Sequence, residues 1–314
     1  MIIKLLESLN VSEDQINELA QPLKDLGHQF VYYPTKTTDV EELKKRSEHA
    51  DVIMIANNPY PKEVIESNPK LQLINVAFTG FDHVELDNSA IKMCNASGYA
   101  NTAVAELVIG LVLDVYRKIS KGNQEIRTSE FPGPFQGGEI KDKVIGIIGA
   151  GKIGLETAHL FKAFGATIIA DDFMPTAEGK ELGITYLPQD EVFKQADIIS
   201  LHVPLMDATK GLVNKERLEM MKPSAILINC ARGPIVDNAA LTVALNDGTI
   251  AGAGIDVFDM EPPIPSDYPL LQAKNAVLTP HVGFLTNEAM VRRAIIAFDN
   301  TIAFLNGSPK NIVN

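Results

Sequence analysis

The chain has 314 residues, 46% of them hydrophobic and 22% charged, so it can bury a sizeable core and exceeds the usual size of one domain. Its formal net charge of −12 argues against a nucleic-acid surface, and no apolar run approaches the roughly 20 residues that span a membrane. The composition predicts a two-domain α/β protein of the cytoplasm that binds neither nucleic acid nor membranes.

The two cysteines, Cys94 and Cys230, are too few for a disulfide framework or a cysteine zinc site. Their scarcity is typical of proteins from a reducing compartment. We therefore expect no structural disulfide and no metal.

The first hundred residues alternate short apolar segments with helical stretches. Such alternation is typical of a parallel sheet covered by helices. Strands are expected at 2–5, 30–33, 52–55 and 71–76, and helices near 12–26, 39–48 and 61–67.

A polar, glycine-rich turn at 95–101 leads into a predicted helix at 103–119. Its apolar residues cover more than one face, as expected for a helix buried between domains, so we place the first domain boundary after residue 100. Residues 122–138 are expected to form an irregular connection.

Residues 144–154 combine an apolar strand, a Gly-x-Gly-x-x-Gly turn and the start of a helix. Gly149 can make the tight turn, Gly151 lets the backbone approach a pyrophosphate, and Gly154 allows the helix to pack closely on the strand. The N-terminal N–H groups of the helix then face the phosphates. This order of elements predicts dinucleotide binding.

A second apolar strand, 166–170, is followed by Asp171 and Asp172. Asp172 lies about 20 residues beyond the glycine turn, where the acid that hydrogen-bonds the ribose of NAD is expected. Because both aspartates would repel a 2′-phosphate, the predicted coenzyme is NAD.

Further apolar segments complete a six-strand doubly wound pattern, with strands near 197–201, 224–229, 251–256 and 275–278. The last helix, 287–305, lies beyond the final strand and is expected to return to the first domain. We therefore assign 1–100 and 287–314 to one discontinuous domain and 101–286 to the NAD-binding domain.

Motifs along nearly the whole chain resemble those of the D-isomer-specific 2-hydroxyacid dehydrogenases. The matching segments are 77–84, 98–107, 149–154, 201–205, 228–237, 254–258, 261–262 and 279–283. The resemblance implies a Rossmann-type doubly wound NAD domain inserted into a flavodoxin-like parallel α/β substrate domain, with the active site in the cleft between them. It also implies hydride transfer from NADH to a small 2-keto acid, giving the D-2-hydroxy acid, in a homodimer whose contact lies near helix 103–119.

Hydride transfer to a 2-keto acid needs a cation for the carboxylate, an acid for the developing alkoxide and a group that holds this acid. Arg232 follows the apolar strand 225–228, and its planar fork suits a carboxylate. The resemblance makes His281 the proton donor and Glu261 the carboxylate that bonds the imidazole and favours its protonated form. Alternatively, Arg232 forms a surface salt bridge, His281 is structural, and Glu261 is an exposed loop carboxylate.

The resemblance also implies cofactor contacts. Asp256 resembles the acid that bonds the nicotinamide carboxamide, although a capping aspartate is an alternative. His202 is predicted to be structural, and strand-end packing is an alternative for Val203 and Pro204. The further predicted cofactor contacts are Lys152, Ile153, Val203, Pro204, Thr209, Cys230, Ala231, Arg232, His281 and Gly283.

Three residues of the first domain are predicted to contact substrate. Thr79 and Gly80 match a loop whose backbone N–H groups hold the substrate carboxylate, with a plain tight turn as the alternative. Tyr60, which follows Asn57 and Asn58 after a strand, is predicted to select the substrate side chain.

Two other functions share this architecture. An NADH-sensing corepressor would keep the glycine turn, but the chain lacks extended tails. A formate dehydrogenase would be expected to carry glutamine in place of Glu261.

Overall fold

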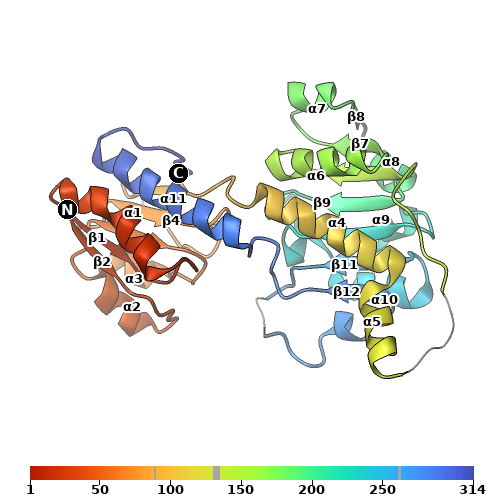
Figure 1. Ribbon diagram of the computed structural model, residues 1–314, viewed down its shortest axis with the longest axis horizontal. Helices are drawn as coiled ribbons and strands as arrows, with labels where there is room; N and C mark the ends of the chain where they lie inside the picture. The colour runs from red at the N-terminus through yellow and green to blue at the C-terminus, as the bar shows by residue number, and fades with distance from the viewer. Residues whose placement is uncertain (88–89, 130–134, 261–262) are drawn as a thin grey trace. The chain divides into compact units, whose positions relative to one another are not determined.

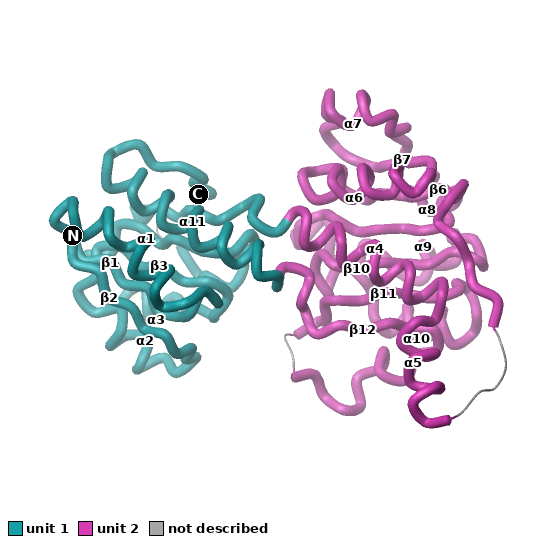
Figure 2. The backbone as a smooth tube through the Cα atoms, in the orientation of Figure 1, with its two compact units in different colours: residues 1–100, 285–314 teal, residues 101–284 magenta. Residues whose placement is uncertain are grey.

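The computed structural model describes residues 1–87, 90–129, 135–260 and 263–314. The chain forms two compact units, with residues 1–100 and 285–314 in unit 1 and residues 101–284 in unit 2 (Figure 2). The sequence places the first boundary at the same residue and the second at 286. Unit 1 is therefore built from both ends of the chain.

Unit 1 contains a five-stranded sheet with strand order β2-β1-β3-β4-β5, in which every neighbouring pair is parallel. This is the flavodoxin-like order. The fifth strand is not apparent from the sequence, because Lys92 and Asn95 bracket only two apolar residues. The strands are β1 (Ile2–Leu5), β2 (Gln29–Tyr32), β3 (Val52–Ile55), β4 (Leu73–Val76) and β5 (Lys92–Asn95).

The first and last helices of the chain pack side by side on the unit 1 sheet (Figure 1). Side chains of both helices join those of β1, β3 and β4 in one apolar core. The buried Asn75 of β4 also donates to the carbonyl of Ala297, 2.6 Å away, and to Thr301 Oγ1, 2.9 Å away. The helices are α1 (Glu13–Asp25), α2 (Val40–Ser47), α3 (Lys62–Glu66) and α11 (Asn287–Leu305).

Unit 2 contains a parallel sheet with the order β12-β11-β10-β9-β6-β7-β8, so the winding direction reverses between β6 and β9. This doubly wound order is the Rossmann type with one further strand. The six-strand prediction was wrong, because β8 has only two residues, too short to show an apolar pattern. The strands are β6 (Val144–Ile148), β7 (Thr167–Asp171), β8 (Thr185–Tyr186), β9 (Ile198–Leu201), β10 (Ile226–Asn229), β11 (Gly252–Ile255) and β12 (Ala276–Leu278).

Two apolar cores hold helices on the unit 2 sheet. α4 packs on α6, and α9 packs against both α8 and α10 (Figure 1). The helices are α4 (Asn101–Arg117), α5 (Ile119–Arg127), α6 (Lys152–Ala163), α7 (Ala177–Glu181), α8 (Gln189–Gln195), α9 (Lys215–Met220) and α10 (Asn238–Asp247), with 3₁₀ turns η1 (Gly233–Ile235) and η2 (Pro269–Gln272). Among the described helices, none combines the length and apolarity needed to cross a membrane.

The predicted helix 103–119 corresponds to α4, and a second helix follows it almost at once. α4 ends at Arg117, Lys118 adopts a left-handed φ of 51°, and α5 begins at Ile119. Residues 122–127, the start of the predicted irregular connection 122–138, therefore belong to α5. Gly122 suggested a loop there, and α5 has no buried residue that would have produced a core-facing pattern.

Candidate active site

The glycine turn joins β6 to α6 and leaves a helix N-terminus open. Gly149 has a φ of +92°, and a Cβ on Gly154 would overlap the carbonyl oxygen of Gly149. In contrast, a Cβ on Gly151 would meet nothing within 4 Å, and no side chain caps α6 there. Lys152 and Ile153 form the first turn of α6, so their N–H groups have no intrahelical acceptor. This cradle fits a pyrophosphate.

Asp172 contacts the glycine turn directly. Its Oδ2 accepts a hydrogen bond from the Ala150 N–H at 2.7 Å, and its Oδ1 accepts one from the Met174 N–H at 2.7 Å. Asp171 instead accepts from Gln189 Nε2 at 2.7 Å. The structure therefore places the carboxylate of Asp172, rather than that of Asp171, at the glycine turn, a position that suits the ribose of a dinucleotide.

The loop after β9 lies against the same turn. A Cβ on Gly149 would be 2.9 Å from Val203 Cγ1 and 2.9 Å from the carbonyl carbon of His202. Thr209 is buried, and its hydroxyl donates to the Pro204 carbonyl at 2.6 Å and accepts from the Met206 N–H at 2.8 Å. Its side chain thus closes the loop that holds Val203 and Pro204.

His202 contacts a neighbouring side chain inside unit 2, which agrees with the structural role predicted for it. Its Nε2 lies 2.9 Å from Ser200 Oγ, and desolvation lowers its pKa to about 4. The imidazole is therefore neutral near pH 7.

Arg232 is presented by a turn that a buried asparagine holds. Asn229, the last residue of β10, is fully buried; its Nδ2 donates to the Arg232 carbonyl at 3.0 Å, and its Oδ1 accepts from the Ala231 N–H at 3.0 Å. The half-buried guanidinium donates to the Ala231 carbonyl at 2.8 Å. The sequence did not single out Asn229, although an amide directly before Cys230-Ala231-Arg232 is a signal for such a turn.

Cys230 lies within this turn. Burial, with the nearby Asp256 charge, raises the pKa of its thiol well above the usual value. The thiol is therefore protonated near pH 7 and is a poor nucleophile. Its side chain packs against the core beneath the sheet edge.

Asp256 holds the turn that carries His281. The carboxylate is 1% exposed; Oδ1 accepts from Thr279 Oγ1 at 2.6 Å and the Val282 N–H at 2.9 Å, and Oδ2 accepts from the Gly283 N–H at 2.8 Å. Burial raises the pKa of Asp256, and these three hydrogen bonds partly oppose that shift. The fit is tight, because a Cβ on Gly283 would lie 3.0 Å from Asp256 Oδ2.

His281 occupies a left-handed position, with φ of +55°, that non-glycine residues rarely adopt. Its N–H donates to the Asp256 carbonyl at 2.8 Å, and its ring meets Phe284 edge-on at a centroid distance of 5.3 Å. Asp256 thus holds this conformation through its backbone and its side chain. The sequence suggested a nicotinamide contact for Asp256, and the structure adds this positioning role.

Three neighbouring strands bring these groups to one sheet edge. β10, β11 and β12 are parallel neighbours, and Arg232, Asp256 and His281 follow their carboxyl ends. Ligands of open parallel sheets bind at such ends. Glu261 lies outside the described residues, so its role remains a prediction. Among the described residues, no group of three or more His, Cys, Asp or Glu side chains could hold a metal.

The predicted substrate residues of unit 1 differ in exposure. Thr79 and Gly80 follow β4 and are partly exposed, and the Thr79 carbonyl accepts from Asn95 Nδ2 at 2.8 Å. Tyr60 is only 1% exposed, and its hydroxyl lies 2.8 Å from Ser47 Oγ. We therefore replace the prediction that Tyr60 selects the substrate side chain with a core role, because its ring packs inside unit 1.

Several known proteins are similar to this chain in sequence and structure. A hydroxypyruvate reductase of Blautia hydrogenotrophica is 35% identical over 302 residues, covering 93% of this chain and 94% of that protein. A glyoxylate reductase of Thermofilum pendens is 37% identical over 286 residues, covering 87% and 84%. The D-lactate dehydrogenase of Aquifex aeolicus, solved with NAD and lactic acid, superposes with a TM-score of 0.84 at 27% identity, covering 100% and 99% of the two chains.

The family prediction is also confirmed directly. Residues 109–283 match the family model for the NAD binding domain of D-isomer specific 2-hydroxyacid dehydrogenases. This match spans more than half of the chain and includes the glycine turn, Arg232, Asp256 and His281. The chain belongs to the D-isomer-specific 2-hydroxyacid dehydrogenase family.

Proposed function

We propose that this protein is an NADH-dependent reductase that converts a small 2-keto acid into its D-2-hydroxy acid. The observation that carries the proposal is the sheet edge of unit 2, where the ends of β10, β11 and β12 present Arg232, Asp256 and His281. The same sheet carries the open glycine cradle and Asp172. The names of the relatives indicate hydroxypyruvate and glyoxylate as the first substrates to test.

NADH, when bound, supplies the hydride, and the residues of the chain supply binding and the proton. The guanidinium of Arg232 binds the substrate carboxylate through two parallel hydrogen bonds and polarises the adjacent ketone. The imidazole of His281 donates a proton to the ketone oxygen as negative charge develops there. Asp256 keeps the turn of His281 in its left-handed conformation, and Glu261 is proposed to stabilise the imidazolium.

Thr79 and Gly80 are proposed to donate backbone N–H groups to the substrate carboxylate. Both follow β4 at the carboxyl edge of the unit 1 sheet and are accessible. Asn95 fixes the Thr79 carbonyl, so this loop is held before substrate arrives.

A substrate panel tests the function. Glyoxylate, pyruvate, hydroxypyruvate and 3-phosphohydroxypyruvate are each assayed with NADH, and the product is analysed for configuration. Turnover of at least one acid to the D-hydroxy acid is expected. Arg232→Lys should raise KM and lower kcat, because a point charge cannot make the two-pronged contact. Absence of turnover throughout the panel contradicts the proposal.

We also propose a homodimer formed by unit 2. α5 follows α4 directly, has no buried residue, and exposes Ile119 by 56% and Ile126 by 68%. An apolar face of this kind is commonly covered by a partner, here a second copy of the chain. Sedimentation at micromolar concentration should report a dimer, and Ile126→Asp should weaken it. A monomeric parent protein would contradict this arrangement.

The proposed location is the cytoplasm. Cys94 and Cys230 are both free thiols. This fits a reducing compartment. Fractionation of cells with an antibody against the protein tests the assignment.

A further inference from the structure

The turn that presents Arg232 lies against the loop after β11. Gly233, which follows Arg232, is buried, and a Cβ on it would overlap the carbonyl group of Phe258 and lie 2.7 Å from the Asp259 nitrogen. The two segments therefore meet backbone against backbone, with no side chain of residue 233 between them. Because protein interiors are close-packed, a shift of one segment is transmitted to the other.

Two side chains from other elements hold Asp259. Asn238, the first residue of α10, donates from Nδ2 to Asp259 Oδ1 at 2.9 Å. Tyr268, which precedes η2, donates its hydroxyl to Asp259 Oδ2 at 2.9 Å. Asn238 is 5% exposed and Tyr268 is 7% exposed, whereas Asp259 itself is exposed. Both oxygens of one carboxylate are thus bonded by donors from the interior of unit 2.

The segment that runs on from Arg232 therefore contacts the loop after β11 at two points. Gly233 begins η1, and Asn238 begins α10. Gly233 meets Phe258, and Asn238 bonds Asp259. Two contacts restrict the direction of a segment as well as its position, so the loop after β11 limits how the turn of Arg232 can move.

Tyr268 supports the loop after β11 from the core. Its ring meets Phe258 edge-on at a centroid distance of 5.8 Å, and both side chains belong to one apolar core. Burial, together with the hydrogen bond to Asp259, raises the pKa of the Tyr268 hydroxyl to about 12. The hydroxyl therefore stays protonated near pH 7 and remains a donor to Asp259.

Polar groups in this place have a cost for folding. Asn238 Oδ1 is buried and has no hydrogen-bond partner among the described residues, and burial of the Tyr268 hydroxyl also removes it from water. Apolar side chains would fill the same space without this penalty, but they would not hold a carboxylate in one place. Buried hydrogen-bonded networks make a structure rigid and specify one arrangement of it.

We propose that Asp259, held by Asn238 and Tyr268, is a positioning residue that keeps the guanidinium of Arg232 aligned with the substrate carboxylate. This inference rests on the proposed role of Arg232. Two parallel hydrogen bonds to a carboxylate require one orientation of the planar guanidinium, and a misplacement of about 1 Å can cost about 100-fold in rate. Asp259 acts through the loop after β11 and Gly233 and does not itself touch substrate.

The test measures binding of oxamate, an unreactive analogue of a 2-keto acid, to the complex of the enzyme with NADH. Asp259→Ala should weaken oxamate binding by about 10-fold, the scale for loss of hydrogen bonds to a charged group, and should raise KM for glyoxylate similarly. NADH affinity should change by less than about 2-fold, because the glycine cradle and Asp172 lie at β6 and β7. Asp267→Ala is the matched control, because Asp267 is an exposed aspartate of the same loop, and it should retain parental binding.

Two conservative variants grade the effect. Asp259→Asn keeps the size of the side chain, an oxygen acceptor for Asn238 and an amide that can donate to the Tyr268 oxygen. Oxamate binding should therefore fall by less than about 3-fold. Tyr268→Phe removes one hydroxyl and keeps the ring against Phe258, so binding should fall by about 3-fold. Tyr268→Phe also replaces Asp259→Ala if that variant does not fold.

A double-mutant cycle shows whether Asp259 acts through Arg232. If it does, adding Asp259→Ala to Arg232→Lys should change oxamate binding by less than about 2-fold, because the two-pronged contact is already lost. A purely structural role of Asp259 predicts instead that the two losses multiply.

The outcomes separate this inference from the proposed function. Unchanged oxamate binding in Asp259→Ala and Tyr268→Phe, or multiplied losses in the cycle, would overturn the inference while turnover by the parent enzyme upholds the reductase function. An equal loss in Asp267→Ala would also overturn the inference. A parent enzyme that neither binds oxamate nor turns over a keto acid would overturn both proposals.

Discussion

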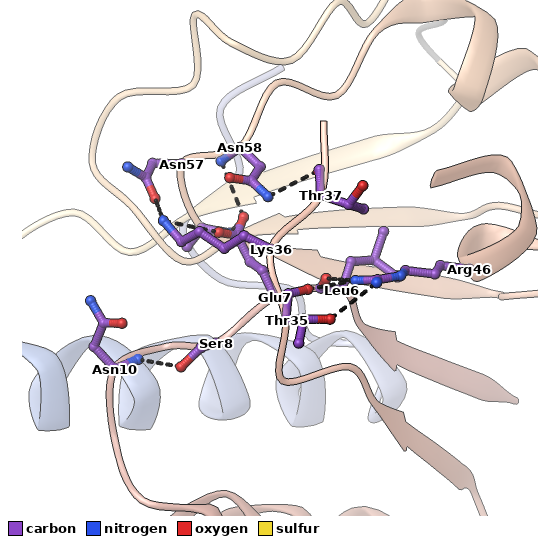
Figure 3. A network of polar contacts seen from close by, with 11 residues as sticks. Leu6, Glu7, Ser8, Asn10, Thr35, Lys36, Thr37, Arg46, Asn57 and Asn58 are labelled. Carbon is purple, nitrogen blue, oxygen red and sulfur yellow. Dashed lines mark hydrogen bonds and ion pairs between the residues drawn. The ribbon is translucent and has the colours of Figure 1, made fainter. Parts of the chain in front are cut away.

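The sheet edges of the two units are built by different means. In unit 2, short side chains and close backbone approach shape the edge, as where Asp256 takes the N–H groups of Val282 and Gly283. In unit 1, long side chains reach across the edge, and Glu7 contacts the loop after β3, about 50 residues away in sequence (Figure 3). Close backbone approach leaves no room for larger side chains, so the unit 2 edge should tolerate few substitutions. We therefore expect the largest effects on the reaction from substitutions at the unit 2 edge.

The largest effect should come from the unit 2 edge. If His281 donates the proton, His281→Ala should lower kcat by roughly 100-fold or more, the scale for loss of a positioned general acid. NADH binding, measured by titration, should survive. The exposed His159 of α6 provides the matched control, and His159→Ala should retain parental turnover. Near-normal turnover in His281→Ala would mean that another group supplies the proton.

The next effect concerns the coenzyme. Asp172 accepts one N–H group from the glycine turn and one from its own loop, so its carboxylate is held where the ribose is expected and should repel a 2′-phosphate. NADH should be favoured over NADPH by at least about 100-fold in kcat/KM. Asp172→Ser should narrow this ratio, while Asp171→Asn should leave it almost unchanged. Comparable efficiencies in the parent enzyme would refute the assignment.

One chemical change made at both edges tests the comparison most directly. Asp256→Asn places an amide N–H group against the N–H of Gly283 or Val282, so the turn of His281 loses support. We expect kcat to fall by about 10-fold for every keto acid and the free energy of unfolding to fall by about 1–3 kcal/mol. Glu7→Gln should instead lower the free energy of unfolding and leave kcat almost unchanged, because the contacts of Glu7 lie within unit 1. Kinetics and denaturant titration measure both, and a uniform loss in both variants would erase the distinction between the edges.

The smallest predicted effect is a pH dependence of stability. The folded-state pKa of His202 is lowered to about 4 from 6.5, so between these values the unfolded chain binds a proton that the folded chain does not. Stability is therefore lost as pH falls through that window, by about 1 kcal/mol between pH 7 and pH 5.5. His202→Gln should abolish this part of the dependence in denaturant titrations. An equal slope in the variant would assign it to other groups.

Much of the unit 2 site could be predicted from the sequence, because its residues are close together in sequence or directly follow a strand. Gly149, Gly151 and Gly154 are close neighbours in sequence; backbone geometry requires glycine at 149 and 154, and Gly151 leaves open space before α6. Arg232 and His281 stand directly after apolar strands, so a strand pattern alone brings them to one edge. The family followed from the same segments.

Other features depended on contacts between distant residues. Tyr60 follows a strand and was expected to face substrate, yet Ser47 and the unit 1 core bury it. β8 is too short to show a pattern, and β5 has polar ends that hide it. The polar network of Glu7, Lys36 and Asn57 joins residues from three separate loops.

By itself, the sequence determined the family, the coenzyme and the parallel α/β architecture of both units, because periodic strands and glycine turns are local features. Only the tertiary structure decided that Asp256 holds the His281 turn and that Glu7 holds the backbone after β3. The sequence alone does not show whether the carboxylate of an Asp or Glu residue is buried or exposed. The surroundings of the carboxylate, which set its partners, exist only after the chain has folded.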